Sequence, residues 1–446
     1  MITLEDYLKR NATEYPDKTA VVSADSSLSY LSLWKMVERR ADELKQEHEN
    51  RIVVFRSSQS ADFLITYFAV HLAGKIAVPL ERDVPQSVMD SISGNLDRVE
   101  KRGADDIPSD VADILFTTGT TGKAKGVMVS HRAIIADAEN LVEAQGYSSN
   151  LTFIVSGPLN HIGSLSKLYP MIYLGGTVYI TEGMKDMSAF FSAIENADGK
   201  VATFLVPASI SMLMRFGEER FRQCADKIDF IETGAAPMPL ADMQKLCTLL
   251  PNSRLYNTYA STETSIISTF DYNAGECVAG CLGKPMRHSA VVVSADGHVA
   301  CSGDTLMSGY VGDRELTASV LYDGCMHTSD LGSLDAEGRL HLSGRDGDVV
   351  NIGGYKVSPT EVENAAMLSP LVKDCVCLPA SHPVLGTVLR LLVVLADGCR
   401  LDKRKIALCI RQRLEAYKVP LYYEEIEKVN RTYNGKIDRK SYTLSK

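Results

Sequence analysis

The residues best suited to chemistry form a loop of threonines, glycines and lysines directly after an apolar strand, within Ile114–His131. Glycines let backbone N–H groups face outward, and the hydroxyls and lysines add further donors, so the loop suits a polyphosphate. It is not the common NTPase P-loop, because Ala124 stands five residues after Gly119 and Val127 stands five after Gly122. By itself, the loop also matches an ordinary hairpin turn.

The strands and helices that must position this loop follow a regular alternation. From about Arg51 to Tyr259, short apolar runs alternate with longer amphipathic stretches, which is typical of parallel α/β sheets covered by helices on both faces. The predicted strands are Ile52–Phe55, Ile76–Leu80, Asp113–Thr117, Thr152–Val155, Thr177–Thr181, Val201–Val206 and Lys227–Glu232. The predicted helices are Asp62–Ala73, Ala133–Glu143, Ser188–Asn196, Ser209–Phe216 and Leu240–Leu249.

After Tyr259 the pattern changes. Short glycine-rich strands between Gly280 and Leu342 indicate a small antiparallel barrel or sheet. The polar segment 344–348 indicates a linker, and the residues beyond it suffice for a separate small α+β domain. We therefore expect an α/β protein with a large N-terminal domain (1–344) of parallel α/β sheets plus a small β-barrel-like region, a linker (345–348) and a small α+β C-terminal domain (349–446).

The composition is that of a globular enzyme or binding protein. The 446 residues contain 47 Lys and Arg against 56 Asp and Glu, a net charge of −9, which argues against nucleic acid or an anionic membrane as the main partner. The N-terminus does not look like a signal peptide, and the most apolar run, Leu389–Ala396, is too short to span a bilayer. The ten cysteines lack zinc-site spacing. We expect a cytoplasmic protein with reduced thiols and no membrane span. The sequence does not indicate the oligomeric state.

Further motifs accompany the loop in a fixed order. They are Tyr15-Pro-Asp-Lys-Thr-Ala20, Pro158-Leu-Asn-His161, Glu232-Thr-Gly-Ala-Ala-Pro237, Asn257-Thr-Tyr-Ala-Ser-Thr-Glu263, His327-Thr-Ser-Asp-Leu-Gly332, Gly344-Arg-Asp-Gly-Asp348 and Asn434-Gly-Lys-Ile-Asp-Arg439. With the loop, this series resembles the adenylate-forming superfamily, which includes acyl- and aryl-CoA ligases, nonribosomal peptide synthetase adenylation domains and firefly luciferase. One departure is Ala124, where the family usually has proline.

The resemblance implies an ATP site with three parts. The phosphates are expected against Thr117, Thr118, Gly119, Thr120, Thr121, Gly122 and Lys125. Adenine is expected between Tyr259 and the turn formed by Gly234, Ala235, Ala236 and Pro237, with Asn257 near its exocyclic amine. Asp330 is expected to accept hydrogen bonds from the ribose hydroxyls. The resemblance also makes 345–348 a hinge and 349–446 a mobile domain, and Arg345 is expected to approach the nucleotide from this hinge.

The resemblance also implies the catalytic residues for joining a carboxylate to the α-phosphate of ATP, which brings two anions together and requires cations and oriented donors. Lys436 is expected to bridge the carboxylate and the α-phosphate. Glu263 is expected to bind Mg²⁺, which usually takes few protein oxygens when it binds nucleotides. Thr262 is expected to contact the α-phosphate, and His161 belongs to the substrate-gate motif.

The acyl group is expected among Asn160–Ser164, Gly234, Ala235, Ala260 and Ser261. Peptide-synthetase domains carry an aspartate for the substrate ammonium at the position of Ile162, and an unpaired ammonium against isoleucine is costly. An α-amino acid is therefore disfavoured. Ala260, where the family usually has glycine, narrows the channel and favours a short or flat acid.

The acceptor is expected to be the thiol of coenzyme A, because Pro158–Gly176 is similar to the o-succinylbenzoate–CoA ligase type. A carrier protein's phosphopantetheine presents the same thiol and stays an alternative. A third interpretation is that the protein is a non-catalytic nucleotide-binding relative. The retained Lys436, Glu263 and threonine loop argue against it.

Overall fold

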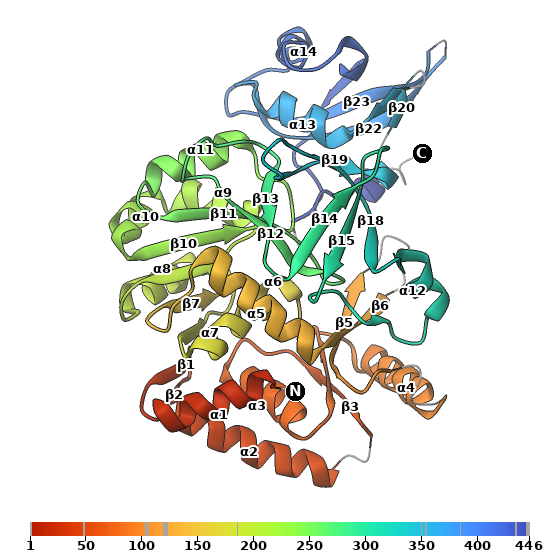
Figure 1. Cartoon of the computed structure of the whole chain (residues 1–446). Helices are drawn as coiled ribbons and strands as arrows, with labels where there is room; N and C mark the ends of the chain where they lie inside the picture. The colour runs from red at the N-terminus through yellow and green to blue at the C-terminus, as the bar shows by residue number, and fades with distance from the viewer. Residues whose placement is uncertain are drawn as a thin grey trace.

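The computed structural model describes residues 2–47, 50–102, 107–118, 124–184, 186–348, 350–352, 355–383, 385–432 and 435–442. Two sheets dominate these residues, one of 14 strands and one of five, and a smaller unit lies at the C-terminal end of the chain (Figure 1). The expected α/β class is confirmed. None of the described helices has the length and apolarity needed to cross a membrane.

The centre of the large sheet is parallel, in the order β11-β10-β9-β7-β8-β1. Its strands are buried on both faces: on β10, Phe230 packs into one apolar cluster and the adjacent Ile231 into another. Neighbouring residues of a strand point to opposite faces, so helices must cover both sides. The strands are β1 (Thr19–Ser23), β2 (Ser26–Ser29), β7 (Thr152–Val155), β8 (Thr177–Ile180), β9 (Val201–Phe204), β10 (Ile228–Thr233), β11 (Arg254–Ser261) and β12 (Ser265–Asp271).

Two groups of helices cover the two faces of the large sheet. One apolar cluster contains residues of α1, α2, α3, α5 and α7, and the other contains residues of α8 to α11. The helices are α1 (Leu4–Glu14), α2 (Tyr30–Glu47), α3 (Ala61–Leu72), α4 (Gln86–Arg102), α5 (His131–Gln145), α6 (Ile162–Leu165), α7 (Leu168–Leu174), α8 (Met187–Asn196), α9 (Pro207–Phe216), α10 (Glu218–Cys224), α11 (Leu240–Leu249) and α12 (Arg314–Val320). Helix α5 begins where Ser130 caps the backbone N–H of Ala133 and ends at Gly146, whose φ is +63°.

The five-stranded sheet carries the Thr/Gly/Lys loop. Its strands are β3 (Ile52–Arg56), β4 (Ile76–Leu80), β5 (Val111–Thr118), β6 (Ala124–Ser130) and β16 (Gly309–Tyr310), in the order β16-β6-β5-β4-β3. Strands β5 and β6 pair antiparallel, so the loop is the tip of a long hairpin. Strand β16 comes from almost two hundred residues downstream and pairs with β6.

The glycine-rich strands form an antiparallel extension of the large sheet. They are β13 (Cys281–Pro285), β14 (Ser289–Val293), β15 (His298–Gly303), β17 (Leu321–Tyr322), β18 (Cys325–Leu334) and β19 (Leu340–Arg345). Strand β13 pairs with β12 on one side and β19 on the other, which joins the extension to the main sheet. At the junction, a Cβ on Gly283 (φ +74°) would overlap the Thr269 backbone, so only glycine allows this approach.

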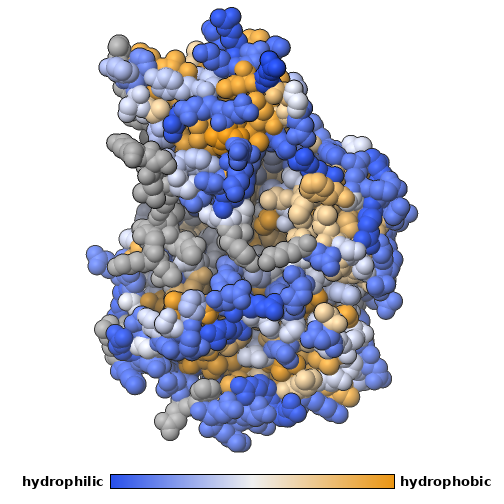
Figure 2. Space-filling model, turned by 180° about the vertical axis from the view of Figure 1, so that it is seen from behind, coloured by the Kyte–Doolittle hydropathy of each residue, from blue (hydrophilic) through white to orange (hydrophobic). Residues whose placement is uncertain are grey.

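The C-terminal unit has its own apolar core around Val362, Val393 and Ile406. It contains β20 (Val350–Ile352), β21 (Tyr355–Val357), α13 (Pro359–Met367), β22 (Val372–His382), β23 (Gly386–Leu395), α14 (Lys403–Arg411) and β24 (Tyr422–Glu425). Figure 1 shows it above the large body, and seen from behind the surface is hollowed between the two (Figure 2). An ion pair crosses between them, with Arg215 of α9 3.5 Å from Asp397.

Buried charges fasten the C-terminal end of β10, which leads into the Gly234–Pro237 turn. Lys167 and Glu232 are both fully buried, and their Nζ and Oε1 atoms lie 2.7 Å apart. Thr258 donates a hydrogen bond to the same Glu232 oxygen. Asp137 of α5 lies near this pair and accepts the backbone N–H of Ile266 at 3.1 Å. Burial raises the pKa of Asp137 to about 7, although Lys167 acts in the opposite direction.

This pKa predicts how stability depends on pH. The folded state holds the Asp137 proton more tightly than the unfolded chain, so the contribution of Asp137 to the free energy of unfolding falls between about pH 4 and pH 7 by on the order of a few kcal/mol. The asparagine in Asp137→Asn cannot ionise but keeps an acceptor for the Ile266 N–H. Between about pH 4 and pH 7, the free energy of unfolding of this variant should therefore fall less than that of the wild type, by the contribution of Asp137. Urea denaturation at pH 4.5 to 8 tests this, with the exposed Asp25→Asn as control. Parallel profiles for wild type and Asp137→Asn would contradict it.

Candidate functional site

The β5–β6 hairpin holds the two ends of the expected phosphate loop. Thr117 and Lys125 face each other across the hairpin, and the backbones of Thr118 and Ala124 form the next pair. Gly119, Thr120, Thr121 and Gly122 lie outside the described residues. Their roles, and that of the Thr118 side chain, stay predictions.

Tyr310 of β16 links Lys125 to Glu263. Its hydroxyl donates to Glu263 Oε1 at 2.9 Å, and Lys125 Nζ lies 5.2 Å from the centre of its ring. The face of an aromatic ring attracts a cation, so one side chain orients both a carboxylate and an ammonium. Burial and the Glu263 carboxylate raise the pKa of Tyr310. The sequence motifs gave no indication of this residue.

Glu263 and Thr262 occupy the tight turn between β11 and β12. Ser261 and Thr264 close this turn through hydroxyl and backbone hydrogen bonds, and the backbone N–H of Met307 donates to the Glu263 carbonyl at 2.8 Å. The turn thus presents one carboxylate to Tyr310, whose ring centre lies 5.2 Å from Lys125 Nζ. A single hard oxygen ligand fits Mg²⁺, which takes its remaining ligands from phosphate and water.

Asp330, Tyr259 and Arg345 form a compact group where the ribose is expected. The Tyr259 hydroxyl donates to Asp330 Oδ2 at 2.7 Å, and Arg345 Nε donates to Asp330 Oδ1 at 2.5 Å. Asp330 and Arg345 are cross-strand partners in the β18–β19 ladder, which explains their contact. Burial and the Asp330 carboxylate raise the pKa of Tyr259, so its phenol stays a donor.

The turn expected to contact adenine has a strained backbone. Ala235 adopts φ +67°, a conformation that costs energy for a residue with a side chain and that often marks functional sites. A Cβ on Gly234 would lie 2.8 Å from Thr258 Oγ1, so the turn packs tightly on β11. Asn257 is buried, and its amide donates to the Cys281 carbonyl at 3.0 Å. The oxygen of this amide is the group left to meet an exocyclic amine.

Lys436 reaches the same region from the other end of the chain. Partial burial and the Arg345 guanidinium lower its pKa, and the Asp330 and Glu263 carboxylates act in the opposite direction. The ammonium therefore lies within electrostatic reach of all three, although the side chain stays accessible to solvent.

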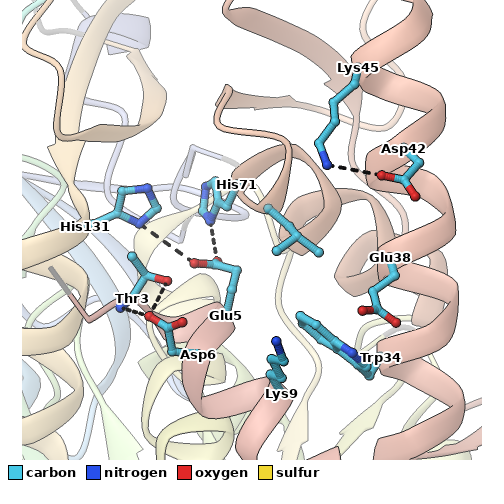
Figure 3. Close-up of a pocket in the computed structure, with 11 residues that line it drawn as sticks. Thr3, Glu5, Asp6, Lys9, Trp34, Glu38, Asp42, Lys45, His71 and His131 are labelled. Atoms are coloured by element: carbon cyan, nitrogen blue, oxygen red, sulfur yellow. Dashed lines mark hydrogen bonds and ion pairs between the residues drawn. The ribbon is translucent and has the colours of Figure 1, made fainter.

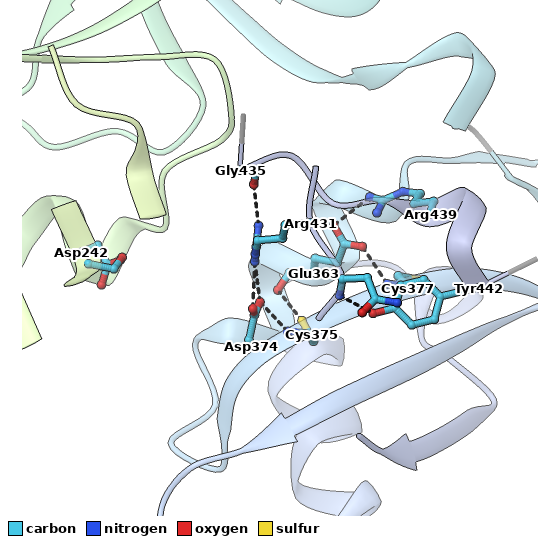
Figure 4. A network of polar contacts seen from close by, with 11 residues as sticks. Asp242, Glu363, Asp374, Cys375, Cys377, Arg431, Gly435, Arg439 and Tyr442 are labelled. Atoms are coloured by element: carbon cyan, nitrogen blue, oxygen red, sulfur yellow. Dashed lines mark hydrogen bonds and ion pairs between the residues drawn. The ribbon is translucent and has the colours of Figure 1, made fainter. Parts of the chain in front are cut away.

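The turn that carries Lys436 is attached to the C-terminal unit by two arginines (Figure 4). Arg431 donates to the Gly435 carbonyl at 3.1 Å and pairs with Asp374 at 2.8 Å. Arg439 pairs with Glu363 of α13 at 2.9 Å. These contacts hold the turn, and with it Lys436, on the C-terminal unit.

Two of the residues expected to surround the acyl group, Gly163 and Gly234, lie close to Phe204, which the motifs did not reveal. A Cβ on Gly163 would lie 3.2 Å from the Phe204 ring, and one on Gly234 would lie 3.6 Å from it. Ile162 is almost fully buried. His161 Nε2 lies 2.6 Å from Glu81 Oε1, another partner that sequence reasoning missed, and this contact lowers the pKa of Glu81.

Comparisons with known proteins assign the family. The model of the AMP-binding enzyme family matches residues 8–97 and 90–311, and the model of the AMP-binding enzyme C-terminal domain matches residues 361–436. The chain belongs to the AMP-binding enzyme family.

Several relatives cover nearly the whole chain. Indoleacetate–CoA ligase of Aromatoleum aromaticum is 27% identical, with 97% of this chain and 96% of the relative covered. Feruloyl-CoA synthase of Amycolatopsis is 28% identical, with 96% of each covered. ATP-bound MatB from Rhodopseudomonas palustris has a similar fold, with a TM-score of 0.86 at 21% identity, covering 99% of this chain and 98% of that one.

Removing the Tyr310 hydroxyl should weaken metal-dependent nucleotide binding. Tyr310→Phe keeps a ring beneath Lys125 but releases Glu263, so the Mg²⁺ concentration giving half-maximal ATP binding should rise by about tenfold or more, as for lost outer contacts to metal ligands. Calorimetric ATP titrations at graded Mg²⁺ measure this, and Tyr322→Phe, a change at an exposed tyrosine, is the matched control. An unchanged Mg²⁺ dependence in Tyr310→Phe would show that Tyr310 does not contribute to the metal site.

Proposed function

We propose that this enzyme activates a carboxylic acid with ATP, releasing pyrophosphate, and then transfers the acyl group from the acyl-adenylate to the thiol of coenzyme A. The observation that carries this proposal is the electrostatic neighbourhood of Lys436, which includes Arg345, Asp330 and Glu263. The names of the curated relatives, which are CoA ligases and synthetases, support it further.

In the first half-reaction, a carboxylate oxygen attacks the α-phosphorus and the bond to pyrophosphate breaks. Lys436 stabilises the negative charge that gathers where the carboxylate meets the α-phosphate. Thr262 contacts the α-phosphate, and Lys125 and Thr117 hold the terminal phosphates. Asp330 orients the ribose, so the reacting phosphorus is held at a set distance from the acyl site.

The metal that accompanies ATP is Mg²⁺ held by Glu263. When bound, it neutralises phosphate charge and favours departure of pyrophosphate. The Tyr310 hydroxyl keeps the Glu263 carboxylate in one orientation.

The second half-reaction requires Lys436 to leave and a thiol to enter. We place the hinge at 345–348, between a domain of residues 1–344 and one of 349–446. Gly344 supports this placement, because its φ of +152° and its close approach to Ser358 exclude a side chain where the two parts meet. Rotation about the hinge would break the Arg215–Asp397 ion pair, an exposed contact that costs little to lose.

The acid has no α-ammonium and is short or flat. The buried Ile162 offers an ammonium no partner. Phe204 beside Gly163 and Gly234 offers an aromatic surface suited to a planar group, in agreement with the indoleacetate and ferulate in the relatives' names. Ala260 adds a methyl group where the channel is expected.

The alternative acceptor is the phosphopantetheine of a carrier protein, which presents the same thiol. Formation of an acyl-CoA thioester when coenzyme A is the only thiol supplied would favour coenzyme A over a carrier protein as the acceptor.

Substrate class is tested by ATP–pyrophosphate exchange with a panel of aromatic acids, short aliphatic acids and amino acids. We expect exchange with one of the first two classes at a rate far above that with any α-amino acid, because an ammonium facing Ile162 stays unpaired. Strongest exchange with an ordinary amino acid would refute this assignment.

The role of Lys436 predicts a split between the half-reactions. Lys436→Ala should lower acid-dependent ATP–pyrophosphate exchange by about two orders of magnitude or more, the scale of losing one electrostatic group. Thioester formation from preformed acyl-adenylate and coenzyme A should stay near the wild-type rate, because the lysine is absent from the second transition state. The exposed Lys428→Ala is the matched control. Exchange that survives Lys436→Ala would show that this lysine has no catalytic role.

A further inference from the structure

Three potential metal ligands, Glu5, His71 and His131, point toward one another beside a pocket (Figure 3). Glu5 lies in the first turn of α1, His71 in the last turn of α3, and His131 begins α5. Each offers one ligand atom, and these atoms all lie within 4.8 Å of one another. Among the described residues, this is the one group of three or more His, Cys, Asp or Glu with such spacing.

The individual distances match a cation between the three side chains. His71 Nδ1 lies 2.9 Å from Glu5 Oε1. His131 Nδ1 lies 4.0 Å from Glu5 Oε2, which is too long for a hydrogen bond. Zn²⁺ binds nitrogen and oxygen ligands at about 2.0–2.2 Å, so tetrahedral ligand atoms stand somewhat over 3 Å apart. The two gaps to Glu5, 2.9 and 4.0 Å, lie on either side of that value.

The far side of His71 has the partner that a metal-bound histidine usually has. Its Nε2 lies 3.0 Å from Asp113 Oδ1, and Tyr67 donates to Asp113 Oδ2 at 2.8 Å. A carboxylate in this position fixes the orientation of the imidazole, and Nδ1 then faces Glu5, where a metal would replace the proton of their hydrogen bond. His71 and Asp113 are almost completely buried, so the arrangement is held rigidly.

The surroundings favour a cation and give it a route. The three side chains lie along a cavity of about 580 Å³, which supplies space for a water as fourth ligand. Besides His71 and His131, its titratable lining consists of Glu5, Asp6, Glu38 and Asp42 against Lys9 and Lys45. An excess of acidic groups raises the local concentration of divalent cations.

We propose that Glu5, His71 and His131 bind one Zn²⁺ ion, with a water from the cavity as fourth ligand and Asp113 as the outer partner of His71. Two imidazoles and one carboxylate favour Zn²⁺ over Mg²⁺ or Ca²⁺, which prefer oxygen ligands throughout. The ion takes the place of the proton between His71 Nδ1 and Glu5. It ties α1, α3 and α5 together and, through Asp113, reaches β5, the strand that leads to the phosphate loop.

The test uses the full chain, stripped with chelator and desalted. Zn²⁺ is titrated without nucleotide or acid, with excess Mg²⁺ present as a competitor. Bound metal is counted by mass spectrometry after desalting. We expect one Zn²⁺ per chain, a higher melting temperature with Zn²⁺, and visible d–d absorption of tetrahedral Co²⁺ that Zn²⁺ abolishes. The proposal would be overturned if the wild-type chain retained less than half an equivalent of zinc and showed no d–d absorption with Co²⁺. This result needs no variant.

Two variants locate the ion. His131→Gln and Glu5→Gln should each bind Zn²⁺ at least about tenfold more weakly than wild type and lose the thermal shift. His288→Gln is the matched control, because His288 also lies between two carboxylates, Glu139 and Asp304, in a different part of the fold. Zinc binding that survives both ligand substitutions, or that falls equally in His288→Gln, would overturn the assignment of the ligands. Circular dichroism and ATP binding confirm that each variant is folded.

Discussion

The repulsion between a carboxylate and the phosphates of ATP is the constraint on which the rest of this structure depends. In the site that we propose, cations from distant parts of the chain counter this repulsion: Lys125 on the β5–β6 hairpin, Arg345 on β19 and Lys436 near the C-terminus. These cations also repel one another, and Arg345 lowers the pKa of Lys436. The Asp330 and Glu263 carboxylates offset this repulsion, so the site holds a high density of positive charge without leaving it unbalanced.

Two tyrosines support these carboxylates. Tyr259 donates to Asp330 and Tyr310 donates to Glu263, and in each case the aromatic ring packs among apolar residues while the hydroxyl faces the site. A buried phenol donates one well-directed hydrogen bond and cannot easily ionise. The ring of Tyr310 also lies beneath Lys125. The orientation of the charged groups therefore depends on the packing of the two sheets against each other.

Much of the fold could be predicted, because local pattern and burial agree along the parallel strands. Ile76–Leu80 and Thr152–Val155 are strands with the predicted bounds, and both are buried throughout. Helix 240–249 likewise has its predicted bounds. The strands between Gly280 and Leu342 were expected as a small antiparallel barrel or sheet, and they do pair antiparallel, but their continuity with the main sheet through β12 and β13 was not predicted. Hydrogen bonding between strands that are short and glycine-rich has little signature in local periodicity.

The sequence by itself determined the family, the order of its motifs and the chemical types available for binding ATP, since each motif is a short segment whose residues interact locally or with the nucleotide. Only the tertiary structure decided which side chains support them. His161 meets Glu81 across 80 residues, Glu263 meets Tyr310 across 47, and Lys167 meets Glu232 across 65. Glu5, His71 and His131 likewise converge from three helices. Such pairs depend on how helices and sheets pack, and packing brings together residues whose separation along the chain carries no periodic signal.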